Sequence, residues 1–327
     1  MKRIIQVCVF SVLAGLLSIS VLAQRGGVLN PSVKEIPYDL VPNFLKLPPN
    51  VYMGEGIGVA RDSKGHVYTY TRSGATRLYE FDEKGNFIRE ISPGNYGFEM
   101  AHGVRVDAAD NIWIVDEGTN MVVKFNPEGR TTMVIGHRPD PFVGLPTAAT
   151  FYSNANPPKT YEFDRPTDVA FDPNGNFFVA DGYGNSRVAK YDKNGRFVKT
   201  TGSRGNGAGQ LNTPHSIQAD AKGNVYVADR GNNRIQVYDT NLAFKKTITG
   251  IGAPWTLQVT NKYVYSGDGT GKLYQLDRNS GKLLGWAQTG LGYGQTGCII
   301  HSLHAESDNV LYRGSCSEWD IEKITIK

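Results

Sequence analysis

Two stretches of the chain, DVAFDPNGNFFVAD at residues 168–181 and SIQADAKGNVYVAD at residues 216–229, are copies of one pattern. Each has a run of alternating apolar residues, a polar Asp-x-x-Gly-Asn segment, and a second apolar run that ends in Asp. The alternation has the period of a strand rather than a helix, and Asp, Gly and Asn supply the backbone geometry of a tight reversal. Each stretch therefore predicts two antiparallel strands joined by a turn.

The pattern continues and recurs along the chain. The segments NSRVAKY (185–191) and NNRIQVY (232–238) predict a third strand, with a fourth strand after the next turn. Counting further copies, the repeats start at residues 58, 103, 168, 216, 256 and 302, with gaps of 45, 65, 48, 40 and 46 residues. Such periods with four strands each are typical of propeller blades. We predict an all-β, six-bladed β-propeller over residues 51–327, preceded by an N-terminal extension at 24–50.

The longest gap contains an insertion at about residues 137–165, rich in Pro, Asn and Thr. Long irregular segments inside compact folds are often functional, so we interpret this one as a rim loop.

Composition excludes one class of partner. The 327 residues include 35 Lys and Arg against 31 Asp and Glu, a formal net charge of +4, and no Lys/Arg run is present. A charge this small gives no field suited to phosphate backbones, so we expect no nucleic-acid partner. We also expect a monomer.

The first residues resemble a signal peptide. Lys2 and Arg3 precede an apolar run at residues 4–22, and VLA at 21–23 supplies small residues for cleavage after Ala23. We expect residues 1–23 to be removed, the mature protein to be secreted or periplasmic, and no membrane span to remain. The alternative is an uncleaved anchor helix, because the run is nearly long enough to cross a bilayer.

Two cysteines remain after that cleavage, Cys298 and Cys316. In an exported protein an even number of cysteines without Cys-x-x-Cys spacing favours a disulfide over a metal pair. The alternative is that both are core residues.

Three histidines occupy the same position of the repeat. His102, His215 and His301 each stand one residue before the first strand of the second, fourth and sixth blades. Alternate blades are about 120° apart around the axis, so the three imidazoles should converge at the central channel. Three histidines with an open fourth position are the ligand set of catalytic zinc. The alternative is a set of polar channel residues bound to backbone groups or water.

The equivalent residues of the other blades, and the remaining histidines, give no comparable indication of a metal site. The equivalent residues of the first, third and fifth blades are Ile57, Thr167 and Trp255. We expect His66 and His137 to be solvated, and His304 has no assigned role.

Strand direction places two more side chains at the same mouth. If the first strand starts on that face, the loop between the second and third strands returns to it, which brings Arg72 and Tyr183 there. Arg72 could bind a carboxylate with two parallel hydrogen bonds, and Tyr183 could act as a base beside zinc. Alternatively, they are a surface cation and a packed aromatic residue.

The copies resemble NHL repeats, a family of six-bladed propellers. Five motifs further resemble the peptidyl-α-hydroxyglycine α-amidating lyases: YTRSG (70–74), AHGVRVD (101–107), RPTDVA (165–170), DGYGNSR (181–187) and TPHSI (213–217). The resemblance implies a zinc ion on His102, His215 and His301, with Tyr183 and Arg72 as the catalytic pair. The implied reaction cleaves the N–Cα bond of a C-terminal α-hydroxyglycine to give an amide and glyoxylate. The implied partner is a small molecule or short peptide with a free carboxylate.

The chain also departs from that family. A structural calcium ion in the family is partly held by an Asp directly after the third histidine, where this chain has Ser302. A family disulfide cysteine beside the tyrosine is Gly184 here, and the hydroxylase domain that makes the lyase substrate is absent from this sequence. Two other functions stay open: a propeller that binds a peptide or glycan without chemistry, and a lyase or hydrolase for a cyclic substrate.

Overall fold

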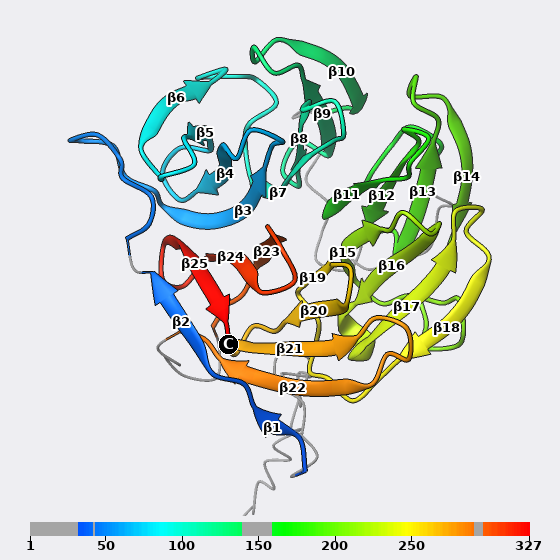
Figure 1. Cartoon of the computed structure of the whole chain (residues 1–327). Coiled ribbons are helices and arrows are strands. Elements are labelled where there is room, and N and C mark those ends of the chain that lie inside the picture. Colours follow the sequence, from blue (N-terminus) through cyan, green and yellow to red (C-terminus); the bar gives the residue numbers. More distant parts are fainter. Residues whose placement is uncertain (1–31, 42, 139–158, 291–296) are drawn as a thin grey trace, which may run out of the picture.

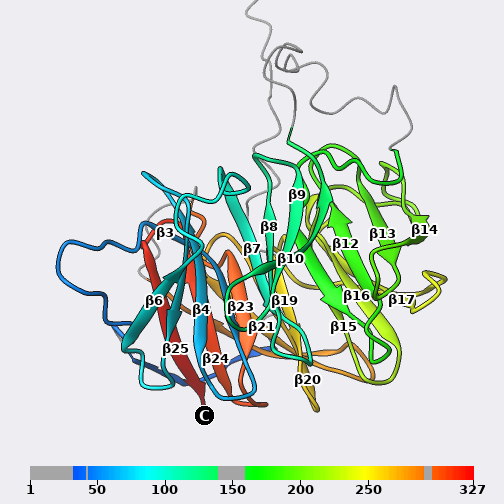
Figure 2. The same ribbon diagram turned by 90° about the horizontal axis from the view of Figure 1, so that it is seen from above.

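Six β-sheets surround a common axis in the computed structural model, which describes residues 32–41, 43–138, 159–290 and 297–327 (Figure 1). Within each sheet consecutive strands are antiparallel, and the inner strands β3, β7, β11, β15, β19 and β23 contact one another in a closed ring. Figure 2 shows the blades from the side. The prediction of an all-β, six-bladed propeller is confirmed.

The blades have the following strands. The first has β3 (Glu55–Arg61), β4 (Val67–Arg72), β5 (Arg77–Phe81) and β6 (Phe87–Ile91), and the second has β7 (Ala101–Val106), β8 (Ile112–Asp116), β9 (Met121–Phe125) and β10 (Thr131–Gly136). The third has β11 (Asp168–Phe171), β12 (Phe177–Asp181), β13 (Arg187–Tyr191) and β14 (Phe197–Thr201). The fourth has β15 (Pro214–Ala219), β16 (Asn224–Asp229), the short 3-10 helix η2 (Arg230–Asn232), β17 (Arg234–Asp239) and β18 (Phe244–Ile248). The fifth has β19 (Thr256–Val259), β20 (Tyr263–Gly267), β21 (Lys272–Asp277) and β22 (Leu283–Gln288), and the sixth has β23 (Ser302–Ala305), β24 (Val310–Ser315) and β25 (Asp320–Ile326).

The N-terminal segment completes the last two sheets, which differs from the expected boundary at residue 51. Strand β2 (Tyr38–Val41) pairs antiparallel with β25 as the fourth strand of the sixth blade, and β1 (Lys34–Glu35) pairs parallel with β22. The backbone groups at the free edge of β25 find partners in this way. The proposed leader, residues 1–23, lies outside the described residues, as do residues 139–158 of the insertion.

The Asp-x-x-Gly-Asn segments form the predicted turns. Asp172 Oδ1 accepts hydrogen bonds from the backbone N–H of residues 174 and 176, at 2.9 and 3.0 Å. Asp220 Oδ1 does the same for residues 222 and 224. Gly175 and Gly223 have φ of 82° and 77°, a conformation that other residues adopt only with strain. The turns therefore fix the register between the first and second strands.

The apolar core is divided among the seams between neighbouring blades. One cluster joins Trp113 of the second blade to Val169 of the third, and another joins Val59 of the first blade to Tyr312 of the sixth. Leu45 packs into this closing seam. In the described part of the chain, no helix has the length and apolar character needed to cross a membrane.

Cys298 and Cys316 form a disulfide in the sixth blade, with their Cα atoms 5.3 Å apart. It ties the segment before β23 to the loop after β24, and Cys316 is buried against the first blade.

An ion pair links the inner strands across the central channel. Arg105 donates from Nε and Nη2 to the two carboxylate oxygens of Asp168, at 2.9 and 2.6 Å, and from Nη1 to the carbonyl of Leu303 at 3.2 Å. Ser216 Oγ donates to Asp168 Oδ2 at 2.8 Å, so the network joins four inner strands. The cavity that remains at the centre of the channel has a volume of about 20 Å³.

This channel does not fit the calcium ion that the lyase resemblance implies. Ser302 supplies no carboxylate, and Asp168 already accepts bonds from Arg105, Ser216 and the backbone N–H of Val169 and Ile217. A divalent cation here would lie beside a guanidinium group that already neutralises the carboxylate. We therefore derive no role for calcium.

Replacing Arg105 tests this network. Arg105→Ala leaves the buried Asp168 carboxylate unpaired, so we expect the free energy of unfolding to fall by about 3–5 kcal/mol in urea titrations. The control is Arg77→Ala, because Arg77 pairs with Glu90 only at 4.0 Å on the surface and should cost less than about 1 kcal/mol. Calcium and EGTA should leave the wild-type melting temperature unchanged, and a rise on adding calcium would contradict our interpretation of the channel.

His304, which had no assigned role, lies in β23, and its ring centroid is 6.3 Å from that of Tyr312. Burial lowers its pKa to about 3, and the nearby Arg105 and Arg61 act in the same direction. An unfolded histidine has a pKa near 6.5, so the unfolded state binds more protons between about pH 6.5 and 3 and stability falls as the pH falls through that window.

The glutamine variant at this position should show a weaker pH dependence. We expect the free energy of unfolding of His304→Gln to fall less steeply than that of the wild type between pH 6 and 4, by up to about 1.4 kcal/mol per pH unit. Urea titrations at a series of pH values measure this, and equal slopes would mean that folding does not lower the pKa of His304.

Candidate metal centre at the channel mouth

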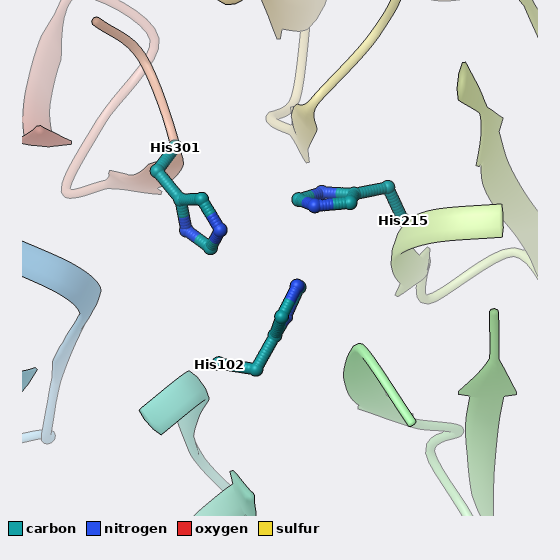
Figure 3. Close-up of side chains that lie close together, drawn as sticks. All are labelled: His102, His215 and His301. Atoms are coloured by element: carbon teal, nitrogen blue, oxygen red, sulfur yellow. The ribbon is translucent and has the colours of Figure 1, made fainter. Parts of the chain in front are cut away.

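The three histidines of the shared repeat position converge at the axis (Figure 3). His102 and His215 are the second residues of β7 and β15, while His301 directly precedes β23. Their ring centroids are 4.6, 4.8 and 5.0 Å apart, and one nitrogen of each ring lies within 4.8 Å of the others. Each residue is at most 4% exposed. The structure therefore brings together all three predicted ligands.

Backbone carbonyls orient the three rings in one way. Nδ1 of His102 is 2.6 Å from the carbonyl oxygen of Thr167, Nδ1 of His215 is 2.5 Å from that of Trp255, and Nδ1 of His301 is 2.8 Å from that of Ile57. Each acceptor is the residue at the histidine position of the next blade. A carbonyl only accepts, so each Nδ1 carries the proton and each Nε2 keeps its lone pair.

The surroundings keep these imidazoles neutral. Burial lowers the pKa of all three, and the positive charges of Arg72 or Arg230 lower it further. Neutral histidines whose other nitrogen is fixed by a carbonyl are the usual ligands of zinc and similar divalent metals. The residues present thus fit the zinc ion that the resemblance implies.

Tyr183 lies directly beside this centre. Its hydroxyl oxygen is 3.2 Å from Nε2 of His215 and 3.4 Å from Nε2 of His102. Burial raises its pKa, which Arg230 opposes, and Arg230 Nη1 is 3.4 Å from the same hydroxyl.

The glycines around Tyr183 are needed for packing. A Cβ atom at position 184 would come within 1.9 Å of the Asp164 carboxylate, and one at position 182 within 2.1 Å of the Pro214 carbonyl oxygen. The Gly184 that replaces the family cysteine therefore suits the backbone of this loop.

Arg72 ends β4 at the same mouth, but other groups already bind it. Its Nε donates to Glu55 Oε2 at 2.6 Å and its Nη1 to the carbonyl of Ala101 at 3.2 Å. Much of its hydrogen-bonding capacity is thus used within the protein.

Two further charged residues of the mouth, Glu117 and Arg230, were not among the predicted site residues. Glu117 Oε2 is 3.5 Å from Nε2 of His102 and 4.0 Å from Nη1 of Arg72. The Arg230 guanidinium lies 4.5 Å from the ring centroid of Trp255 and 5.1 Å from that of Tyr183. Both residues directly follow the aspartate that ends the second strand of a blade, so comparing that position between repeats could have identified them.

Neither of the two histidines expected to be solvated belongs to the centre. His66 is half-buried and its Nδ1 lies 2.9 Å from Glu80, while His137 is exposed and its Nε2 lies 3.7 Å from Glu162.

Sequence comparisons find two groups of relatives. Residues 163–191 and 211–238 match the NHL repeat. NHL repeat-containing protein 3 of Mus musculus is 33% identical over 199 residues, which cover 58% of this chain and 53% of that protein. A probable peptidyl-alpha-hydroxyglycine alpha-amidating lyase of Caenorhabditis elegans is 28% identical over 256 residues, 70% of this chain and 67% of that protein. Peptidyl-glycine alpha-amidating monooxygenase B of Xenopus laevis is 35% identical over 217 residues, 58% of this chain and 23% of that protein. This chain thus spans about half the length of the first relative and less than a quarter of the last.

Solved structures with the same architecture are more distant in sequence. A streptogramin B lyase aligns with a TM-score of 0.57 at 14% identity, over 89% of this chain and 98% of that one. The virginiamycin B lyase of Staphylococcus aureus has a TM-score of 0.57 at 13% identity, over 89% and 100%. At these identities the likeness extends to the fold alone. The chain is therefore a six-bladed propeller with NHL repeats, and it resembles the peptidyl-α-hydroxyglycine α-amidating lyases.

Proposed function

We propose that this protein is an exported, zinc-dependent lyase that cleaves the N–Cα bond of an α-hydroxyglycine-type substrate into an amide and glyoxylate. The observation that carries the proposal is the set of three neutral imidazoles with a tyrosine hydroxyl 3.2 Å from one of their free nitrogens. Zinc, when bound, would act as a Lewis acid toward the substrate hydroxyl oxygen. Export rests on the leader-like residues 1–23, and the Cys298–Cys316 disulfide suits an oxidising compartment.

The side chains of the mouth supply the proton transfers. Tyr183, once it has lost its own proton, takes the proton of the substrate hydroxyl at Oη, the C–O bond becomes the carbonyl of glyoxylate, and the N–Cα bond breaks. The departing nitrogen takes a proton to complete the amide, and Tyr183 can return the proton it received. Arg230, beside the same hydroxyl, favours the ionised form of Tyr183 and so assists the first transfer.

The substrate carboxylate has two candidate partners. Arg72 keeps part of its guanidinium free but already pairs with Glu55. Arg230 has no carboxylate partner among the described residues, and it contacts the ring of Trp255 and both the ring and the hydroxyl of Tyr183. We therefore assign the carboxylate to Arg230 together with Arg72.

Metal analysis and product assays test the proposal. Protein purified without chelators should contain about one zinc per chain, and it should release glyoxylate from α-hydroxyhippurate or an α-hydroxyglycine peptide. If metal-loaded protein releases no glyoxylate from either, the lyase proposal fails. The mouth would then suit the alternative function, a propeller that binds a peptide or glycan without chemistry.

Two substitutions separate proton transfer from carboxylate binding. Tyr183→Phe should lower kcat by about 10²-fold or more without loss of zinc, the usual scale for a general base. Arg230→Ala should raise KM for the free acid more than for its methyl ester. Tyr263→Phe, in β20 of the fifth blade, is the matched tyrosine control and should leave kcat and KM unchanged. Full activity in Tyr183→Phe would show that another group takes the proton.

A further inference from the structure

The charges around the three histidines are unfavourable for a bare divalent cation. The three histidines supply no negative charge, and two guanidinium groups lie close to them. Arg72 Nη1 is 3.2 Å from the carbonyl oxygen of Ala101, the residue before His102. Arg230 Nη1 is 3.4 Å from the Tyr183 hydroxyl, which is itself 3.2 Å from Nε2 of His215. The Arg165 guanidinium lies 5.7 Å from the ring centroid of Tyr183, next to the same centre. These guanidinium groups would repel a metal with two positive charges, so a negative charge nearby would favour metal binding.

We propose that Glu117 supplies that charge and is part of the metal centre. This inference rests on the proposed function, because it assumes that the three histidines hold a divalent metal. Glu117 Oε2 lies 3.5 Å from Nε2 of His102, the nitrogen that keeps its lone pair. In the described ranges, no other carboxylate lies within 4 Å of any of the three histidines.

The spacing suits a group that shares a metal with His102. Two ligands at 2.0–2.1 Å from a tetrahedral zinc are about 3.3–3.4 Å apart, close to the separation seen between Glu117 and His102. The carboxylate pairs only loosely with Arg72, at 4.0 Å, and accepts no hydrogen bond from the described residues. Its oxygens are therefore available to the metal or to a group bound there.

The backbone fixes Glu117 in this place. Its N–H donates to the carbonyl of Met100 at 3.0 Å, two residues before His102. The preceding Asp116 accepts the backbone N–H groups of Glu99 and Met100, both at 2.9 Å. The carboxylate and the histidine are thus held by one short stretch of hydrogen-bonded backbone.

The chain offers a matched control in Glu55. This carboxylate also lies at the mouth and pairs with the same arginine, with Oε2 2.6 Å from Arg72 Nε, but it contacts none of the three histidines. Replacing either glutamate by glutamine removes one negative charge near Arg72. Only the Glu117 substitution removes a charge that contacts a histidine ligand.

Metal affinity tests the inference without recourse to turnover. The full chain, stripped of metal, is titrated with Co²⁺ and Zn²⁺ against a chromogenic chelator for the wild type, Glu117→Gln, Glu117→Asp and Glu55→Gln. We expect Glu117→Gln to bind both metals about 10–100-fold more weakly and to change the visible spectrum of the cobalt form. Glu117→Asp should keep more of the affinity than Glu117→Gln, and Glu55→Gln should stay within about threefold of the wild type.

The outcomes are distinguishable. Equal melting temperatures of the metal-free proteins establish that Glu117→Gln is folded. Suppose that the wild type binds metal and that the metal affinity of Glu117→Gln is within threefold of the wild-type value, or that both glutamine variants lose affinity equally. Glu117 is then not part of the centre, while the proposed function stands. If the wild type binds no metal, both fail.

Discussion

A buried aspartate at the end of the second strand holds the mouth of this propeller in shape. Asp116, Asp181 and Asp229 are completely buried. Each accepts the backbone N–H of a residue that leads into the inner strand of the blade: Met100 at 2.9 Å, Asp164 at 2.9 Å and Asn212 at 2.7 Å, respectively. A buried carboxylate without donors is costly, so the inner strand and the loop after the second strand keep one relative position. That position brings loop side chains next to the histidines.

The same constraint explains how one scaffold carries several kinds of chemistry. The residue after each aspartate starts the loop at the mouth, and it is Glu117 in the second blade, Gly182 in the third and Arg230 in the fourth. Equivalent backbone positions thus provide a carboxylate, a guanidinium group, and a glycine that lets the next residue, Tyr183, reach two of the histidines. The hydrogen bonds that fix these loops use the aspartate rather than the varying residue, so the chemistry can change without loss of the fold.

The features of the fold and of the site that the sequence could predict are those that recur from blade to blade. The turns, the six blades and the convergence of His102, His215 and His301 follow from spacing that recurs every 40 to 65 residues. Strand β2 could not be predicted, because it has only four residues and no turn motif beside it. It forms by pairing with the edge of β25, which the sequence does not reveal. The pairing of Arg72 with Glu55 was equally hidden, because these residues are 17 positions apart and meet only through the register of β3 and β4. Arg105 and Asp168 belong to the neighbouring second and third blades, and the sequence gives no indication that these two side chains form an ion pair.

The orientation of the histidines suits the metal ion that we propose for this centre. Each imidazole donates a hydrogen bond from its one N–H group, at Nδ1, to a backbone carbonyl. The three Nε2 lone pairs therefore face one another in a buried site that excludes most water. Three acceptors at such distances repel, and the Tyr183 hydroxyl has only one proton to donate to them. Polar channel residues that served the fold alone would be more stable with at least one ring reversed. The carbonyls of Ile57, Thr167 and Trp255 prevent this reversal, because each belongs to the neighbouring blade and is fixed by the ring of inner strands. The fold therefore maintains three lone pairs suited to a metal ion between the nitrogens, and the Glu117 carboxylate, 3.5 Å from His102 Nε2, would offset the charge of the nearby arginines.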